Sequence, residues 1–150
     1  MNKVLKLEVL NDIYNFLTLN LNDAIDNYNL NNNTRLKKVS NISYKDVKSQ
    51  FPEIFFQIKS TNFDYIDITR NENMQITNEC FLSYADKDNS VSFQENIERM
   101  IYIIYDLLLK LTSDNIAYIL IKSVDRDEMQ SKDMQIVKIF VVNFDVITLV

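Results

Sequence analysis

The sequence predicts a single α+β domain that spans residues 1–150. Its expected elements are an N-terminal helix, a four-stranded and mainly antiparallel sheet, a capped helix between the second and third strands, and a C-terminal β-hairpin. Three observations support this class. The chain has 150 residues, a length that suits one domain, and 47% of them are hydrophobic, enough for one core. Helical and strand-like apolar patterns follow in the order helix, two strands, helix, two strands.

The first helix is predicted over about residues 3–29, where apolar residues recur at helical spacing. The residues with this spacing are Leu10, Ile13, Tyr14, Leu17, Leu21, Ile25 and Tyr28. We expect this face to pack on the domain's own core, although a helix that docks on a partner would show the same pattern. The polar segment that follows, to about residue 50, predicts a long loop. Its clustered cations Arg35, Lys37 and Lys38 are expected to form a solvated surface.

Four apolar stretches predict the strands. Pro52 opens the first, "PEIFFQIKST", a position where proline is tolerated because its missing N–H lies outside the ladder. The second is "QITNECFLSYAD", in which Ile76, Cys80 and Leu82 share one face. The last two, "AYILIKSV" and "QIVKIFVVNFDVITLV", flank the charged "DRDEMQSKD" at residues 125–133. That charged segment is predicted to be the solvated tip of a β-hairpin.

The segment "ADKDNSVSFQENIERM", residues 85–100, allows a calcium loop or a helix start. In an EF-hand loop counted from Asp86, the glycine of position 6 would be Val91 and the glutamate of position 12 would be Ile97. The sharp turn and the bidentate ligand are both missing, which argues against calcium. Ser92 and Glu95 have the spacing of a capping box, so we predict that a helix begins here.

On this interpretation the acidic residues before the cap are turn residues. Asp86 and Asp88 lie in a polar stretch, which opposes the burial that a catalytic carboxyl needs to raise its pKa. The capped helix is apolar on nearly all sides: Ile97, Met100, Ile101, Ile103, Ile104, Leu107, Leu108 and Leu111. One side is expected to cover the sheet, and the rest requires the first helix or another subunit.

The composition excludes several classes of site. The chain has no glycine and no histidine, which removes glycine-rich phosphate loops, histidine-based catalysis and most zinc sites. Cys80 is the single cysteine, and its apolar surroundings favour a buried structural thiol. The net charge of −5 does not favour nucleic-acid binding, and no apolar run reaches the length of a membrane span. We therefore expect no metal, no cofactor, no membrane partner and no sequence-specific nucleic-acid partner.

The order of these elements resembles the tail terminator, or tail-completion, proteins of long-tailed phages and phage-tail-like bacteriocins. The resemblance spans nearly the whole chain and is carried by "FPEIFFQIKS", "CFLSYADKDNSVSFQENIERMIYIIYDLL" and "MQIVKIFVVNFDVI". It implies a structural protein and not an enzyme. It further implies a hexameric ring that caps the tail tube and stops its growth, with the tube protein and a neck or sheath protein as partners. The implied location is the bacterial host cytoplasm during assembly, and then the virion or tail-like particle.

The resemblance supplies no catalytic residue, and the charged hairpin tip is our predicted subunit or partner interface. Its residues are Asp125, Arg126, Asp127, Glu128, Lys132 and Asp133. Neighbours in a ring would pair these opposite charges head to tail. Three alternatives stay open: another neck or tail-tube subunit, an adaptor, and a small metal-dependent nuclease built on Asp125, Asp127, Glu128 and Lys132. The type of particle and the contractility of its tail also stay open.

Overall fold

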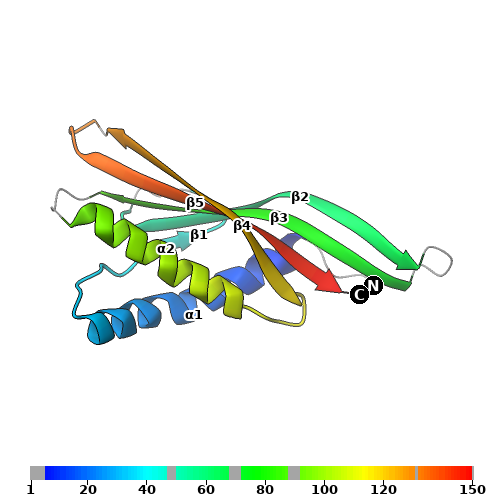
Figure 1. Cartoon of the computed structure of the whole chain (residues 1–150). Helices are drawn as coiled ribbons and strands as arrows, with labels where there is room; N and C mark the ends of the chain where they lie inside the picture. Colours follow the sequence, from blue (N-terminus) through cyan, green and yellow to red (C-terminus); the bar gives the residue numbers. More distant parts are fainter. Residues whose placement is uncertain (1–5, 47–49, 68–71, 88–91, 131, 150) are drawn as a thin grey trace.

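The computed structural model describes residues 6–46, 50–67, 72–87, 92–130 and 132–149. Within these residues the chain forms two helices and five strands. They are α1 (Lys6–Asn32), β1 (Asn41–Ser43), β2 (Glu53–Asp67), β3 (Glu72–Lys87), α2 (Phe93–Lys110), β4 (Tyr118–Gln130) and β5 (Ile136–Leu149). The strands form one sheet in the order β1-β2-β3-β5-β4. Both helices lie on the same side of this long, twisted sheet (Figure 1).

The α+β class is confirmed, but the sheet differs from the predicted four strands. The additional strand, β1, lies in the segment predicted as a loop and pairs with β2 in parallel, with Asn41 opposite Glu53. Three residues are too few for a strand to show any periodicity in the sequence. The other pairs, β2–β3, β3–β5 and β5–β4, are antiparallel as predicted.

Helix α1 presents the predicted apolar face and ends on an asparagine cap. Its buried residues are Val9, Leu10, Ile13, Leu17, Leu21 and Ile25. Tyr14 shares the helical spacing but lies at the margin of the core, 37% exposed. After the last turn Asn33 has a φ of 52°, and the N–H of Thr34 donates to the carbonyl of Asn29 at 3.2 Å. This is the left-handed ending that glycine usually provides, and asparagine tolerates it better than most residues.

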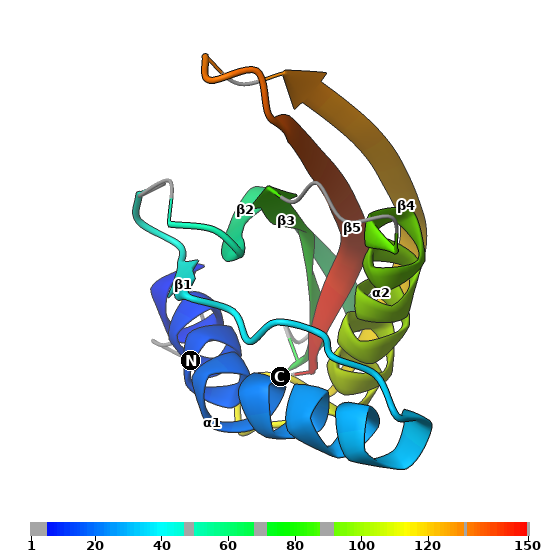
Figure 2. The same ribbon diagram turned by 90° about the vertical axis from the view of Figure 1, so that its left-hand side faces the viewer.

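The core lies between the helices and one face of the sheet. Ile76, Cys80 and Leu82 are all buried, which confirms the predicted parity of the second strand. Tyr84 and Phe140 are opposite each other on β3 and β5, and their rings stack with centroids 4.8 Å apart. Figure 2 shows α1 close to β1, and α2 beside β4 and β5. Each helix therefore covers its own half of the sheet.

Helix α2 begins where the sequence predicted, but the predicted capping box is wrong. In the described part of the chain, the Ser92 side chain makes no capping hydrogen bond, and its backbone angles are φ −87° and ψ 8°. An N-cap serine normally has extended backbone, which aims its hydroxyl at the following N–H groups. Here the Ser92 carbonyl accepts from the N–H of Asn96 at 2.9 Å. Glu95 lies 3.6 Å from Arg99 and does not reach back.

Ser92→Ala is therefore expected to change the free energy of unfolding by less than about 0.5 kcal/mol, because an exposed side chain without a bond is removed. A formed cap would lose about 1 kcal/mol. Urea unfolding followed by circular dichroism distinguishes the two values. A loss of 1 kcal/mol or more would contradict the geometry described here.

Asp86, the first residue of the calcium loop considered in the sequence analysis, has a structural role. Asp86 lies within β3 and not in a turn, and its side chain is only 5% exposed. It accepts hydrogen bonds from the Lys37 ammonium at 3.0 Å and from the N–H of Lys87 at 2.7 Å. Asp88 lies outside the described residues. Lys37, predicted as part of a solvated cluster, instead ties the segment after α1 to the sheet.

Candidate functional site

The β4–β5 hairpin extends beyond the helix layer and carries the predicted interface residues (Figure 1). The structure corrects their location. Asp125, Arg126, Asp127 and Glu128 belong to β4, where they pair with Val141, Phe140, Ile139 and Lys138 of β5. Of the six residues, Lys132 and Asp133 lie in the turn. The sequence did not predict this half of β4 as a strand because its residues are charged. An exposed edge strand does not require alternating apolar side chains.

Arg126 attaches the hairpin to α2. Its Nε and Nη2 donate to the two carboxylate oxygens of Glu98, each at 2.8 Å. These hydrogen bonds lower the pKa of Glu98 from its ordinary value of 4.5. The attachment is therefore fully formed above that ordinary pKa and is lost as the pH falls through the lower folded value. Both side chains are about half exposed, so the bidentate geometry orients the hairpin more than it stabilises the domain.

Other predicted interface charges also have partners inside the chain. Asp125 accepts from the Asn143 amide at 2.9 Å, and Asn143 in turn accepts from Lys59 at 2.8 Å. Asp133 pairs with Lys87 at 2.8 Å. Pairing of these charges with a neighbouring subunit would have to compete with bonds that the single chain already makes. Asp125, Arg126 and Asp133 therefore help to hold the hairpin in place, and the subunit or partner interface at this end of the molecule stays a prediction.

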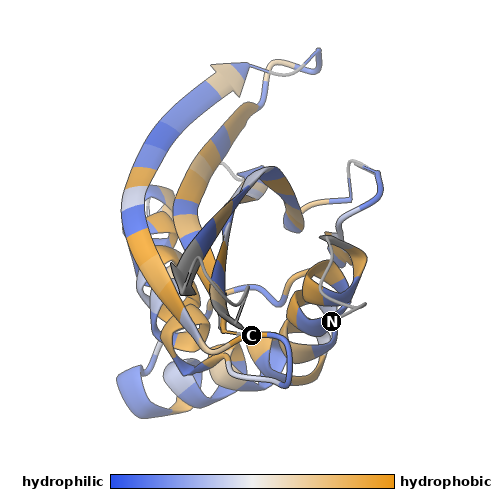
Figure 3. Ribbon diagram, turned by 90° about the vertical axis from the view of Figure 1, so that its right-hand side faces the viewer, coloured by the Kyte–Doolittle hydropathy of each residue, from blue (hydrophilic) through white to orange (hydrophobic). Residues whose placement is uncertain are grey.

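Exposed apolar side chains also lie near the end of the hairpin. Met129, Met134 and Ile136, which we name the hairpin tip residues, are 57%, 73% and 44% exposed. Met129 is opposite Val137 and Gln130 is opposite Ile136, so Met129 and Ile136 leave opposite faces of the hairpin. Figure 3 shows β4 orange near its start and blue through its charged stretch, which the tip residues follow. Sequence reasoning missed their exposure because single apolar residues among charges have no periodicity.

A second apolar surface lies on α2. Tyr102, Tyr105 and Leu109 are 60%, 42% and 47% exposed, and their spacing of three and four residues places them along one stripe of the helix. Beside Tyr102, a groove of about 670 Å³ runs between α1 and α2. We name it the α1–α2 groove. It is lined by Ala24, Asn27, Tyr28, Asn31, Asn32, Tyr102, Ile103, Asp106, Leu107 and Lys110.

The sequence left open whether the apolar residues of the second helix are covered by the first helix or by another subunit. The rings of Tyr28 and Tyr102 are 6.4 Å apart, so α1 packs against one flank of α2. The apolar residues singled out in the sequence, including Ile97, Leu107 and Leu108, are all buried within the chain. What remains uncovered on this helix is the outer stripe from Tyr102 to Leu109.

The acidic residues named for the nuclease alternative do not converge on one face of the hairpin. Asp127 and Glu128 are neighbours in a strand, so their side chains leave opposite faces of the sheet. Asp125 shares a face with Asp127 but is bonded to Asn143. Among the residues that the structure describes, no group of three or more acidic, histidine or cysteine side chains is placed to hold a metal ion.

Cys80 has the properties of a buried structural thiol. It is 3% exposed, and burial, with a smaller contribution from Asp145, raises its pKa to about 12. At neutral pH the sulfur is therefore protonated, and a protonated thiol is a poor nucleophile.

No helix in the described part of the chain is long and apolar enough to cross a membrane.

Comparison with protein-family models gives no match, and comparison with curated proteins gives none either.

Proposed function

We propose that this chain is a structural subunit that assembles into a ring on the end of a phage or phage-tail-like tube and ends the growth of that tube. One observation carries the proposal. A long hairpin, fixed to α2 by Arg126 and Glu98, holds exposed apolar side chains beyond the rest of the domain. Exposed apolar residues on a projecting element are available for a protein–protein contact.

The tail assignment itself rests on the resemblance described above. The order α1, β2, β3, α2, β4, β5 agrees with the order of elements on which that resemblance depends. In the proposal the ring is a hexamer, its partners are the tube protein and a neck or sheath protein, and assembly takes place in the bacterial host cytoplasm. The function requires no catalytic group, metal or cofactor.

Shortening the hairpin tests the proposal. Residues 129–137 are replaced by Asn-Gly, which joins Glu128 to its partner Lys138 through a two-residue turn and leaves the Arg126–Glu98 attachment intact. We expect a folded subunit that no longer forms rings in electron micrographs and no longer limits the length of tubes made from the tube protein. Leu19→Lys is the control, because Leu19 is 73% exposed on α1, away from the hairpin.

Two outcomes would contradict the proposal. Tubes of normal length made with the shortened protein would remove the hairpin from the function. A wild-type protein that stays monomeric, both alone and with tube subunits, would refute the ring and would favour the adaptor interpretation.

A further inference from the structure

We infer that the face of α1 that carries Asn22 and Asn29 is a binding site for an extended peptide segment. Residues 34–40, which we name the strap, lie between α1 and β1 and fill this site in the single chain. The site is separate from the hairpin and does not depend on the proposed ring. The strap acts as an internal competitor, and when it opens it gives the site to another segment.

Two asparagine side chains of α1 bind the backbone of the strap. The Asn29 amide donates to the carbonyl of Leu36 at 3.0 Å and accepts from the N–H of the same residue at 2.8 Å. The Asn22 amide binds Val39 in the same way, donating at 3.3 Å and accepting at 2.9 Å. Each amide therefore replaces a neighbouring strand, which also exchanges two hydrogen bonds with one residue. These four bonds require no particular side chain on the segment that they hold.

The two asparagines are spaced to hold an extended chain. They are seven residues apart on a helix that rises 1.5 Å per residue, so they are separated by roughly 10 Å along α1. Their partners on the strap are three residues apart, and three residues cover this distance only in an extended chain, at about 3.3 Å each. Seven residues are also close to two turns, which places both amides on one face of α1. The site therefore selects an extended backbone.

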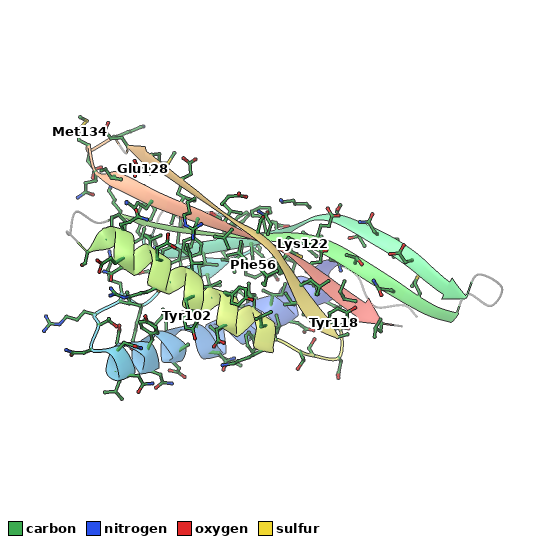
Figure 4. All side chains as sticks on the ribbon, in the orientation of Figure 1. Phe56, Tyr102, Tyr118, Lys122, Glu128 and Met134 are labelled. Carbon is green, nitrogen blue, oxygen red and sulfur yellow. The ribbon has the colours of Figure 1, made fainter. Side chains whose placement is uncertain are left out.

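The apolar side chains of the strap close one end of the core. Leu36 and Val39, the two residues held by the amides, are each 6% exposed. Figure 4 shows the strap leaving the end of α1 that lies below α2 and running toward the sheet. Together with α2 and β3 it encloses a cavity of only about 30 Å³, the volume of one water molecule in the liquid. A segment that replaces the strap therefore needs apolar side chains at the same two positions.

Two carboxylates favour basic residues between the apolar pair. Lys37 lies 3.0 Å from Asp86 of β3, and Lys38 lies 3.2 Å from Asp26 of α1. Both carboxylates are outside the strap, so they stay with the site when the strap leaves. The ligand is thus an extended segment of the pattern apolar–basic–basic–apolar. Within the 150 residues this pattern occurs only in the strap, so a competing segment comes from a second copy or from another protein.

The strap is held less firmly than the sheet. Residues 34–39 belong to no helix or strand, so no ladder of backbone hydrogen bonds runs along them. Side-chain amides hold the backbone of Leu36 and Val39 instead, and the two lysine side chains between these residues are 46% and 60% exposed. Segments of this kind open locally at a lower free energy than core strands. We therefore expect the strap to open while the sheet stays folded.

The closed strap makes the site autoinhibited. A tethered segment has a high effective concentration at its site and excludes weak ligands. The apparent affinity for a separate peptide is reduced to the fraction of molecules whose strap is open. Any change that weakens the strap and spares the carboxylates and amides of the site therefore strengthens the binding of a competing segment.

Amide hydrogen exchange of the wild-type protein tests the opening of the strap. We expect the N–H groups of Leu36 and Val39 to be protected at least about 100-fold less than those of Leu82 and Val142. Leu82 and Val142 are fully buried and pair with each other across β3 and β5. Equal protection of all four groups would show that the strap opens only when the domain unfolds, and would overturn the inference.

A labelled peptide of residues 33–41 tests the site, with binding measured by fluorescence polarisation. We expect Lys37→Ala to bind it about tenfold more tightly than the wild type, because the strap is weakened while Asp86 awaits a lysine from the peptide. Lys38→Ala is the matched control, since its ion pair is exposed on both sides and its affinity should stay within about twofold of the wild type. No gain in Lys37→Ala would contradict the site.

Two further changes test how the peptide is recognised. A peptide that carries Leu36→Ser and Val39→Ser should not bind, because it lacks both apolar side chains. Asn22→Asp combined with Asn29→Asp keeps the shape of the amides but removes their donors, so this protein should bind the original peptide about tenfold more weakly than Lys37→Ala does. Circular dichroism establishes that each variant is folded. Binding of the serine peptide as tight as that of the original would overturn the site, whatever the fold of the aspartate variant.

Mass measurement of Lys37→Ala identifies the source of the competing segment. A dimer that the peptide dissociates would assign the site to the strap of a second copy. A monomer that binds the peptide would assign it to a segment of the same pattern in another protein.

Discussion

Phe140→Ala is expected to lower the free energy of unfolding by about 3–5 kcal/mol, the range for deletion of a buried aromatic ring. Phe140 is fully buried on β5, and its ring stacks on Tyr84 with centroids 4.8 Å apart. The substitution removes that stacking and leaves a cavity between the sheet and the helices. Because a domain has only about 5–15 kcal/mol of stability, the variant would be close to unfolding at 37 °C.

Urea unfolding measured by circular dichroism checks the value. Leu149→Ala is the control on the same strand, because Leu149 is 57% exposed and its loss should cost less than about 0.5 kcal/mol. Phe140→Leu should fall between the two, since it retains most of the apolar volume. Equal effects of Phe140→Ala and Leu149→Ala would show that β5 does not cross the core as described.

The second large effect is expected at Lys37. Lys37→Ala removes a cation from the carboxylate of Asp86, which is 5% exposed, and a buried charge that loses a partner is costly. We expect a loss of about 2 kcal/mol, less than for a fully buried pair because the lysine is 46% exposed.

The neighbouring residue provides the control for this prediction. Lys38 pairs with Asp26 at 3.2 Å, but both side chains are at least half exposed, so Lys38→Ala should cost less than about 0.5 kcal/mol. Thermal melting of the two variants at neutral pH compares them directly. Similar melting temperatures for both would show that Asp86 does not depend on Lys37.

Regular patterns made both helices and the long strands predictable from the sequence. The buried face of α1 follows from the spacing of residues such as Ile13, Leu17 and Leu21, because a core-facing helix must repeat apolar residues every three or four positions. The same reasoning gave the buried parity of β3. The spacing of apolar residues did not predict features that depend on the backbone geometry of a few residues. Examples are the missing side-chain cap at Ser92 and the short strand β1.

The candidate site was only partly predictable. The sequence predicted a C-terminal hairpin but placed residues 125–130 in its tip, whereas they belong to β4. Strand register decides that Arg126 meets Glu98 and that Asp125 meets Asn143. The exposure of Met134 and the groove beside Tyr102 arise from elements far apart in the chain. Neither leaves a periodic signal, so these exposed surfaces emerge only when the elements are placed in three dimensions.

The position of β5 between β3 and β4 has a consequence for synthesis of the chain on the ribosome. β3 and β4 are both made before the strand that joins them, so neither can complete its ladder until residues 136–149 have been added. At about 5–20 residues per second, the inner edge of β3 stays open for roughly 2–10 seconds while α2 and β4 are translated. An open strand edge is a site of misassembly, so slow codons between Phe93 and Gln130 should lower the soluble yield and raise the demand for chaperones.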